Sequence, residues 1–363
     1  MLKSFRDPFL ILLLVMAILV RVFEGNEAWV EQFYSSAFYP QWSSVLRFLF
    51  GWIPFSIGDV LYCIAGFWLI IKMIRLFRIL KEKRLRSKLT PPFFVGYLKL
   101  VLLVYIIFSA FWGVNYFRQG IASQLQLNVQ PYTTAELYSL AVLLQQKVNF
   151  FAGQVTAENR KHFQKSRTLF DTASACYKKA GDAYPFLQYR HQSIKPSFFS
   201  GVGHLFGFTG YYNPFSGEAQ LNHTVPVFLR PFIVLHEIGH QLGYAKENEA
   251  SFVAYLSCSN FNNADFAYSL YFELYRDATL QLQNRIDSAQ LQLLNQRLHP
   301  QVKADNKELH DYLLRHRNFV EPFITKIYDR YLRLNNQPNG KATYSEVLVW
   351  LIAYLKKYGL QSL

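Results

Sequence analysis

The stretch VLHEIGHQLGYAKENEASF, from Val234 to Phe252, contains the residue types from which zinc hydrolases are built. His236 and His240 are four positions apart, so on a helix both imidazoles project from one face and can bind the same ion. Glu237 lies beside them, where its carboxylate can take a proton from a metal-bound water and deliver it to a leaving amine. The spacing predicts a zinc-dependent hydrolase with Glu237 as general base, although a polar helix with two surface histidines gives the same pattern.

A catalytic zinc usually has three protein ligands, so the sequence must supply one more. A histidine three residues after Gly243 would complete the short all-histidine site of metzincins, but Lys246 stands there. Intramembrane site-two proteases take theirs from an Asp-Gly pair, which this chain lacks. Glu247 and Glu249 remain. If a new helix begins near Glu247, Glu249 shares a face with bulky apolar residues and should turn inwards. Glu247 is then better explained as an acidic residue in the first turn, where the helix dipole favours a negative charge. We therefore predict Glu249 as the third ligand, with Glu247 as the alternative.

The elements that position this motif begin with a membrane region. The formal charge is +14, but eight of the basic residues fall between Lys72 and Lys88, opposed only by Glu82. A basic excess confined to one loop indicates membrane topology rather than nucleic-acid binding, so we expect no nucleic-acid partner.

Three apolar stretches surround this basic segment, at about residues 8–23, 48–71 and 93–114. The last two are long enough to cross a bilayer core, and the first has no signal-peptide cleavage site after it, so we interpret it as an uncleaved anchor. A basic cytoplasmic loop at 72–92 then places the N-terminus in the cytoplasm and residues 24–47 in an external loop. Buried core helices of a soluble protein are the alternative, but they would not explain the charge asymmetry.

The chain is thus predicted to have a membrane domain, residues 1–117, and an extracytoplasmic domain, residues 118–363. The second is mainly helical: Thr133 and Glu136 form a capping box, and helical patterns cover about 264–297, 306–334 and a segment that begins at Thr343. Glycine-rich residues 196–226 should form loops and one or two strands, of which EAQLN is the best candidate. Cys63, Cys176 and Cys258 say little, since the last two could pair or remain buried thiols.

Several segments resemble the bacterial family called domain of unknown function 3810. They are the three apolar stretches, WGVNYFR, TGYYNPFSGEAQLN, PFIVLHEIGHQLGYAKENEASFVAYL and YLRLNNQPNGKATYSEV. NEA, at 248–250, is also similar to the glutamate-bearing segment of thermolysin-like gluzincins. The resemblance implies a membrane protein with three N-terminal transmembrane helices plus a mainly α (α+β) zincin-like metallopeptidase domain, with His236, His240 and Glu249 on one zinc ion per chain.

The gluzincin resemblance suggests further roles. An edge strand before the active helix pairs with the substrate backbone in gluzincins, and EAQLN has the matching place in the chain, so we predict substrate contacts from Glu218, Ala219, Gln220 and Asn222. A structural hairpin is the alternative. Tyr331 is our choice for the oxyanion partner, ahead of His310, Tyr211 and Tyr212. His204 and His223 flank the strand region and could line the cleft.

Together these features predict a zinc metallopeptidase of the bacterial cytoplasmic membrane that cleaves a peptide or protein substrate on the outer, periplasmic side. Two other classes remain open. One is a catalytically inactive zinc-binding sensor or scaffold, which would have no use for Glu237. The other is a membrane assembly or transport component, for which Asp59 is the only acid deep in a predicted span. The sequence gives no indication of the oligomeric state.

Overall fold

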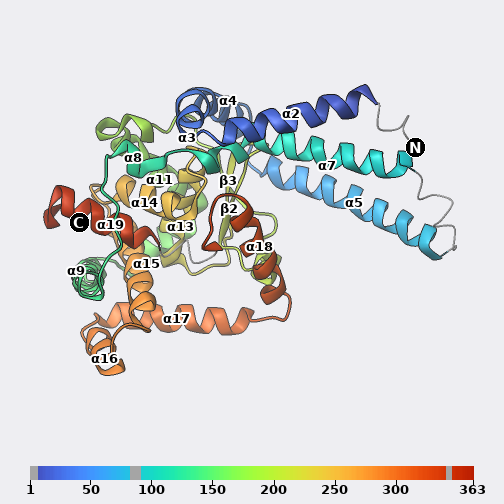
Figure 1. The fold of residues 1–363 in the computed structure, drawn as a ribbon. Coiled ribbons are helices and arrows are strands. Elements are labelled where there is room, and N and C mark those ends of the chain that lie inside the picture. Colours follow the sequence, from blue (N-terminus) through green and yellow to red (C-terminus); the bar gives the residue numbers. More distant parts are fainter. Residues whose placement is uncertain (1–6, 82–90, 341–345) are drawn as a thin grey trace.

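The computed structural model describes residues 7–81, 91–340 and 346–363. The helices α2 and α7 pack side by side and extend from one end of a helical domain, and α5 extends from the same end (Figure 1). The predicted basic loop falls partly on residues 82–90, and most of the capping box predicted at Thr343 falls on 341–345, so both lie partly outside the described residues.

The first predicted span, at residues 8–23, coincides with the helix α2 (Pro8–Glu24), and the chain bends sharply just after it. The chain continues through α3 (Glu27–Trp29), a π-helix η1 (Val30–Phe38) and α4 (Tyr39–Gly51). The α2 segment and the segment that follows it meet at 93° and pass as a membrane span only when taken together. Residues 24–47, which the sequence predicts as an external loop, are largely helical, since α3, η1 and α4 cover most of them.

Among the described residues, two helices are long and apolar enough to cross a bilayer by themselves. They are α5 (Ile57–Lys81), of which Ile57–Arg78 meets the test, and α7 (Pro91–Phe111). At 1.5 Å per residue they measure about 38 and 32 Å, against a hydrocarbon core of about 30 Å. The second predicted span thus begins at Ile57 and not at residue 48, because residues 48–51 end α4. The described chain thus has two helices that could span a membrane, or three if the bent pair is one span.

Asp59, the acidic residue that the sequence places deep in a predicted span, lies in the first turn of α5. Its carboxylate accepts hydrogen bonds from the backbone N–H of Phe198 at 2.7 Å and the hydroxyl of Tyr211 at 2.5 Å. Glu218 accepts the backbone N–H groups of Ile57 and Gly58 at 3.1 and 2.6 Å. These contacts fasten the start of α5 to the domain, and they remove the observation that favoured an ion path.

The remaining helices form the domain in which the core lies. They are α8 (Gly120–Gln124), α9 (Thr134–Ala152), α10 (Ala157–Gln164), α11 (Ser166–Ala183), α12 (Ser200–Phe206), α13 (Arg230–Gln241), α14 (Glu247–Cys258), α15 (Ala264–Leu282), α16 (Ser288–Gln296), α17 (Pro300–His316), α18 (Glu321–Leu334) and α19 (Val347–Tyr358). Short 3₁₀ turns occur at η2 (Gly113–Phe117), η3 (Pro185–Leu187), η4 (Val227–Leu229) and η6 (Leu360–Ser362).

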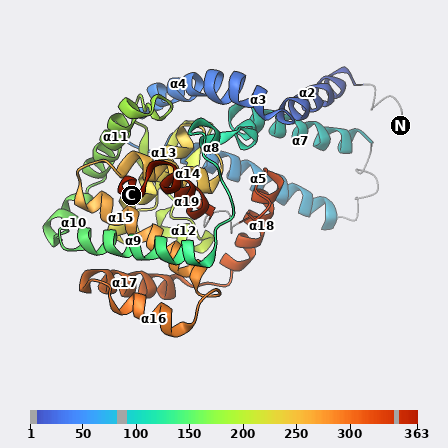
Figure 2. The same cartoon turned by 60° about the vertical axis from the view of Figure 1, so that its left-hand side comes forward.

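Local sequence explains where several of these helices begin. The predicted capping box is confirmed, with Thr133 and Glu136 bonding each other's backbone N–H groups at the start of α9. The two long helices predicted over 264–297 and 306–334 are instead four, because residues 283–287 separate α15 from α16, and because Pro322 stands in the first turn of α18, where it starts a new helix. α13, α14 and α15 lie inside the domain, with α9 across them and α16 and α17 outermost (Figure 2). Cys176 and Cys258 are both buried, free thiols in this core.

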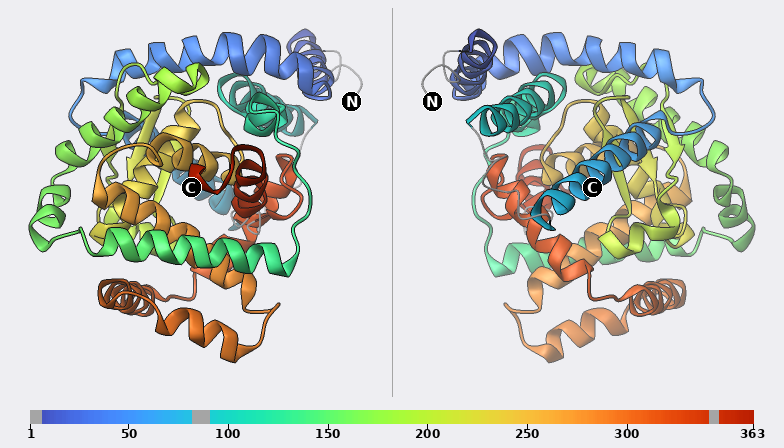
Figure 3. Two further views of the ribbon diagram at one scale, coloured as in Figure 1. Left: turned by 90° about the vertical axis from the view of Figure 1, so that its left-hand side faces the viewer. Right: turned by 90° about the vertical axis from the view of Figure 1, so that its right-hand side faces the viewer.

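The sheet has three strands in the order β1, β3, β2. β3 (Glu218–Leu221) pairs in parallel with β1 (Ile194–Pro196) and antiparallel with β2 (Gly210–Asn213). The strand predicted at EAQLN is therefore correct, but its predicted role as an edge strand is wrong. Both sides of β3 are hydrogen-bonded and its residues are buried, so Ala219 and Gln220 cannot pair with a substrate backbone. The view from the side of the spans shows α5 crossing in front of the domain (Figure 3).

Candidate metal centre

The HEIGH motif lies on α13, as the sequence predicts. Pro231 stands in its first turn, and from Ile233 to Gln241 every residue is buried. The helix ends before Gly243, whose φ of +90° is the left-handed conformation expected after a helix C-terminus. α14 then folds back onto α13, and a Cβ added at Gly239 would stand 3.2 Å from Ala250 Cα. This close approach of the two helices brings the start of α14 to the histidines.

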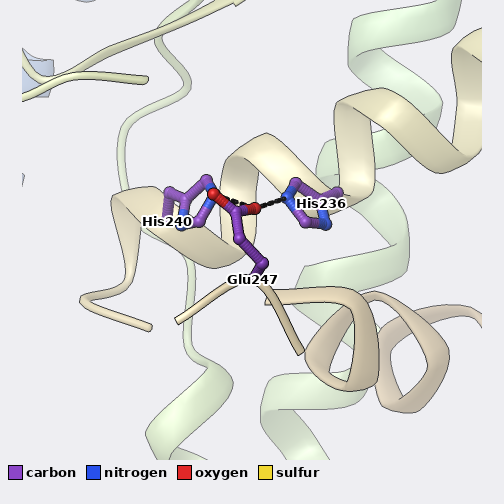
Figure 4. Close-up of side chains that lie close together, drawn as sticks. All are labelled: His236, His240 and Glu247. Carbon is purple, nitrogen blue, oxygen red and sulfur yellow. Dashed lines mark hydrogen bonds and ion pairs between the residues drawn. The ribbon is translucent and has the colours of Figure 1, made fainter. Parts of the chain in front are cut away.

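Three side chains converge between these helices. Oε2 of Glu247 lies 3.0 Å from Nε2 of His236 and 3.5 Å from Nε2 of His240 (Figure 4). All three residues are buried, and one potential ligand atom from each lies within 4.8 Å of the other two. The group combines two helix positions four apart with the first residue of the next helix, so the turn at Gly243 determines its geometry.

Outer hydrogen bonds hold each of these side chains in place. Nδ1 of His240 lies 2.7 Å from the carbonyl oxygen of Tyr244, and Nδ1 of His236 lies 3.1 Å from Oγ of Ser251. An Nδ1–H that donates outwards leaves the Nε2 lone pair directed at the centre, which is the usual arrangement of metal-binding histidines. The hydroxyl of Tyr328 donates to Oε1 of Glu247 at 2.6 Å and fixes the carboxylate.

The electrostatics of the centre follow from burial and from these contacts. Burial alone would raise the pKa of Glu247, but the two histidines overcome it and lower that pKa far below its usual value. Burial opposes the charging of His240, yet the hydrogen bond to Glu247 raises the pKa of His240 to about 9. Burial lowers the pKa of His236. The carboxylate is therefore ionised and ready to act as a ligand.

Glu237 faces the same space without belonging to the group of three. Burial raises the pKa of its carboxyl to about 8. Its Oε2 is buried and has no hydrogen-bond partner among the described residues. A Cβ added at Gly210 would stand 2.7 Å from Oε1 of Glu237, so β2 passes directly beside this carboxyl. A buried polar atom with no partner is costly, which is a reason to expect a ligand next to it.

The donor set fits a zinc ion. Two imidazole nitrogens and one carboxylate oxygen are the three protein ligands of a well-known class of catalytic zinc site. In a tetrahedral site with bonds of about 2.1 Å, ligand atoms are about 3.4 Å apart, close to the 3.0 and 3.5 Å measured from Glu247 to the histidines.

The structure groups Glu247, the alternative third ligand, with the two histidines, and Glu249 is not part of this group. A Cβ added at Gly120 would stand 1.8 Å from Oε1 of Glu249. Burial raises the pKa of Glu249, although Lys246 and Arg118 oppose this. The amphipathic argument could not separate the two glutamates because all twelve residues of α14 are buried. Because α14 is packed on all sides, it has no solvent-exposed face, and helical periodicity alone cannot assign Glu247 to one.

Tyr331, the predicted oxyanion partner, is near the centre but does not bond to it. Its hydroxyl lies 3.1 Å from that of Tyr116, and its ring packs against Tyr328 with centroids 6.0 Å apart. Sequence reasoning missed Tyr328, which is the tyrosine that contacts Glu247. The two tyrosines are three residues apart on α18, and nothing in the sequence distinguishes them.

The alternative site residues lie elsewhere. Tyr212 bonds to the hydroxyl of Tyr39 at 2.9 Å, and the hydroxyl of Tyr211 bonds to Asp59. His310 and His223 are exposed, whereas the ring of His204 packs on His316 with centroids 4.6 Å apart. Of the four residues predicted to contact substrate from the EAQLN strand, Glu218 caps α5, Ala219 and Gln220 lie in the middle of the sheet, and Asn222 bonds to the carbonyl of Phe208 at 3.2 Å.

The N-terminal helices also hold the centre. Oγ of Ser43 on α4 donates to the carbonyl of Gln241 at 2.8 Å, and the Arg118 guanidinium donates to the carbonyl of Gly243 at 3.1 Å. Arg118 is in turn paired with Glu31 at 2.7 Å. The ring of Trp112, just after α7, packs edge-on against His240 with centroids 5.9 Å apart. Segments on both sides of the predicted domain boundary at 117 and 118 therefore fix the end of α13.

These features define a candidate metal centre of two histidines and a glutamate, in a helical protein with helices able to cross a membrane. The chain belongs to the family described as protein of unknown function DUF3810, whose model matches residues 34–352. No curated protein and no solved structure matches the chain.

Proposed function

We propose that the protein is a membrane-anchored zinc metallopeptidase that hydrolyses peptide bonds. The observation that carries this proposal is the convergence of His236, His240 and Glu247 beside the buried, unpartnered carboxyl of Glu237. A centre that only needed to hold a metal for structural reasons would have no use for an acid-base group at this position. An inactive sensor or scaffold is therefore the weaker account.

Each residue has a separate role in the proposed reaction. His236, His240 and Glu247 would hold one zinc ion, which supplies a Lewis acid that activates water and polarises the scissile carbonyl. Glu237 takes the proton from the attacking water and passes it to the leaving amine. Tyr328 keeps the carboxylate of Glu247 in place.

The sheet has two edge strands, β1 and β2, and β2 is the one that passes beside Glu237, so it replaces β3 as the proposed substrate strand. The backbone N–H of Asn222 donates to the carbonyl of Thr209 at 2.9 Å. Since hydrogen-bonded pairs alternate along an antiparallel ladder, Gly210 and Tyr212 direct their N–H and C=O groups away from β3. A peptide in extended form can add to this edge next to Glu237, and backbone pairing tolerates many substrate sequences.

The location follows from the charge pattern. The basic segment that begins at Lys72 lies at the far end of α5 from the metal centre. Under the positive-inside rule, that end is cytoplasmic, and the centre lies on the outer side of the bacterial cytoplasmic membrane. The partners proposed are thus the bilayer and an extracytoplasmic peptide or protein, and no nucleic acid.

The test uses the full chain purified in detergent. We expect about one zinc per chain in the wild type by elemental analysis, none in His240→Ala, and about one in Glu237→Gln. In a quenched-peptide library, Glu237→Gln should lose cleavage by about 10²-fold or more, since its base is gone while its metal is kept. A well-folded wild type that takes up no zinc, or cleavage that survives Glu237→Gln unchanged, contradicts the proposal.

A further inference from the structure

The helix α18 has two faces with different environments. On one face, Tyr328 bonds to Glu247 and Leu332 is fully buried. On the opposite face, Phe323 and Ile327 are four residues apart and leave 65% and 53% of their surface exposed. Large apolar side chains in a row at helical spacing are costly to leave in water. This outer face needs a partner.

The exposed apolar side chains of α18 continue into those of its neighbours. α12 lies at the start of α18, where the amide of Asn318 bonds to the carbonyl of His204 at 3.2 Å. Phe198, Val202 and Phe206 are exposed on and just before α12, and Phe55, just before α5, packs on Phe198 with ring centroids 6.2 Å apart. We call the set Phe55, Phe198, Val202, Phe206, Phe323 and Ile327 the apolar shelf.

The apolar shelf is continuous with the surface of a span. Phe55 stands two residues before α5, whose own exposed apolar side chains face outwards along its length. α18 lies on the side of the domain from which α5 and α7 extend (Figure 1), and Tyr331 on α18 packs against Phe108 on α7 with ring centroids 6.3 Å apart. A bilayer that surrounds α5 and α7 therefore begins where the apolar shelf lies.

The charges on this face have the sign that lipid headgroups attract. Lys326 and Arg330 are exposed on α18 between and beside the apolar residues, and Arg333, which is also exposed, is paired with Asp329 at 2.8 Å. Helices that lie in a membrane surface combine an apolar row, buried about 5–10 Å below the headgroups, with lysine and arginine at the headgroup level.

We propose that α18, with α12 beside it, lies in the headgroup layer of the membrane that α5 and α7 cross, with Phe323 and Ile327 inserted between lipids. A second copy of the chain or a protein partner would not require continuity with α5. The inference concerns lipid contact alone and holds whether or not the metal centre cleaves peptides.

The test measures depth with a nitroxide label on cysteine, in the full chain reconstituted in vesicles of zwitterionic and anionic phospholipid. The native Cys63 lies on the exposed surface of α5 and serves as the reference inside the bilayer, whereas Cys176 and Cys258 are buried and should not react. In a Cys63→Ser background, Phe323→Cys and Ile327→Cys carry the label on the shelf. Phe150→Cys is the matched control, because Phe150 is 64% exposed on α9, on the side of the domain away from the spans (Figure 1).

We expect labels at 323 and 327 to collide more often with oxygen than with a water-soluble nickel chelate, at a depth of about 5–10 Å, and the label at 150 to do the reverse. Labels at 323 and 327 that behave like the one at 150 overturn the proposal. So do labels shielded from both reagents, which would indicate a protein partner. An aqueous label at Cys63 would overturn it as well, since α5 would then not be in the bilayer. None of these readings depends on zinc or on cleavage.

Discussion

The hydrogen bond from Tyr328 to Glu247 allows a specific test of the candidate metal centre, because Tyr328→Phe removes the hydroxyl that contacts this proposed ligand. Its hydrogen bond to Oε1 of Glu247 is 2.6 Å long, and its acceptor is ionised. Hydrogen bonds to charged groups contribute about 1.5–3 kcal/mol, and each 1.4 kcal/mol is a factor of ten. Tyr328→Phe should therefore weaken zinc binding about 10- to 100-fold, as is usual for residues that hold a metal ligand.

The matched control is Tyr331→Phe, on the same helix and with its ring against that of Tyr328. It also removes one buried hydroxyl, but that hydroxyl bonds to Tyr116 and not to the centre. Zinc affinity would be measured by competition with a fluorescent chelator, and the melting temperature of the metal-free proteins would show any general loss of stability. Wild-type affinity in Tyr328→Phe, or an equal loss in Tyr331→Phe, would refute the assigned geometry.

Three further outcomes are expected. Glu247→Gln should lose bound zinc while Glu249→Gln keeps about one ion per chain, and elemental analysis with the reverse result would restore Glu249 as the ligand. In the metal-free protein, the raised pKa of Glu237 favours folding below pH 4.5, and this contribution is lost as the pH rises towards 8. Metal-free Glu237→Gln should thus gain stability relative to metal-free wild type over this range in thermal unfolding, and a constant difference would contradict the pKa. A fragment that begins at Arg118 lacks α4 and its bonds to α13, so it should melt at a lower temperature than the full chain, and equal melting temperatures would show that α4 is dispensable.

The sequence predicted the parts of the centre that depend on local spacing. His236, Glu237 and His240 share α13, which ends before Gly243 as expected, because helix periodicity and a left-handed glycine are properties of short segments. The third side chain of the cluster was not predictable in this way. Its choice depends on how α14 crosses α13, and that crossing is set by the contact of Gly239 with Ala250.

The membrane region shows the same limit. Apolar composition located α5 and α7, but it could not separate the last turn of α4 from the start of a span, since Phe48 and Leu49 are as apolar as the residues of α5. Likewise, β propensity found β3 but not its neighbours. Whether a strand lies at an edge depends on pairing with β1, which comes more than twenty residues earlier in the chain.

The attachment of the domain to α5 and α7 has a consequence for which bonds the proposed peptidase could reach. Glu218 and Asp59 hold the start of α5 to the sheet, and Trp112, just after α7, packs on His240. The candidate metal centre therefore cannot tilt or move independently of α5 and α7. In the proposed peptidase, this attachment would hold the active site at a fixed height above the lipid. The distance of a cleavage site from a substrate's membrane anchor should therefore matter more than the residues that flank the scissile bond.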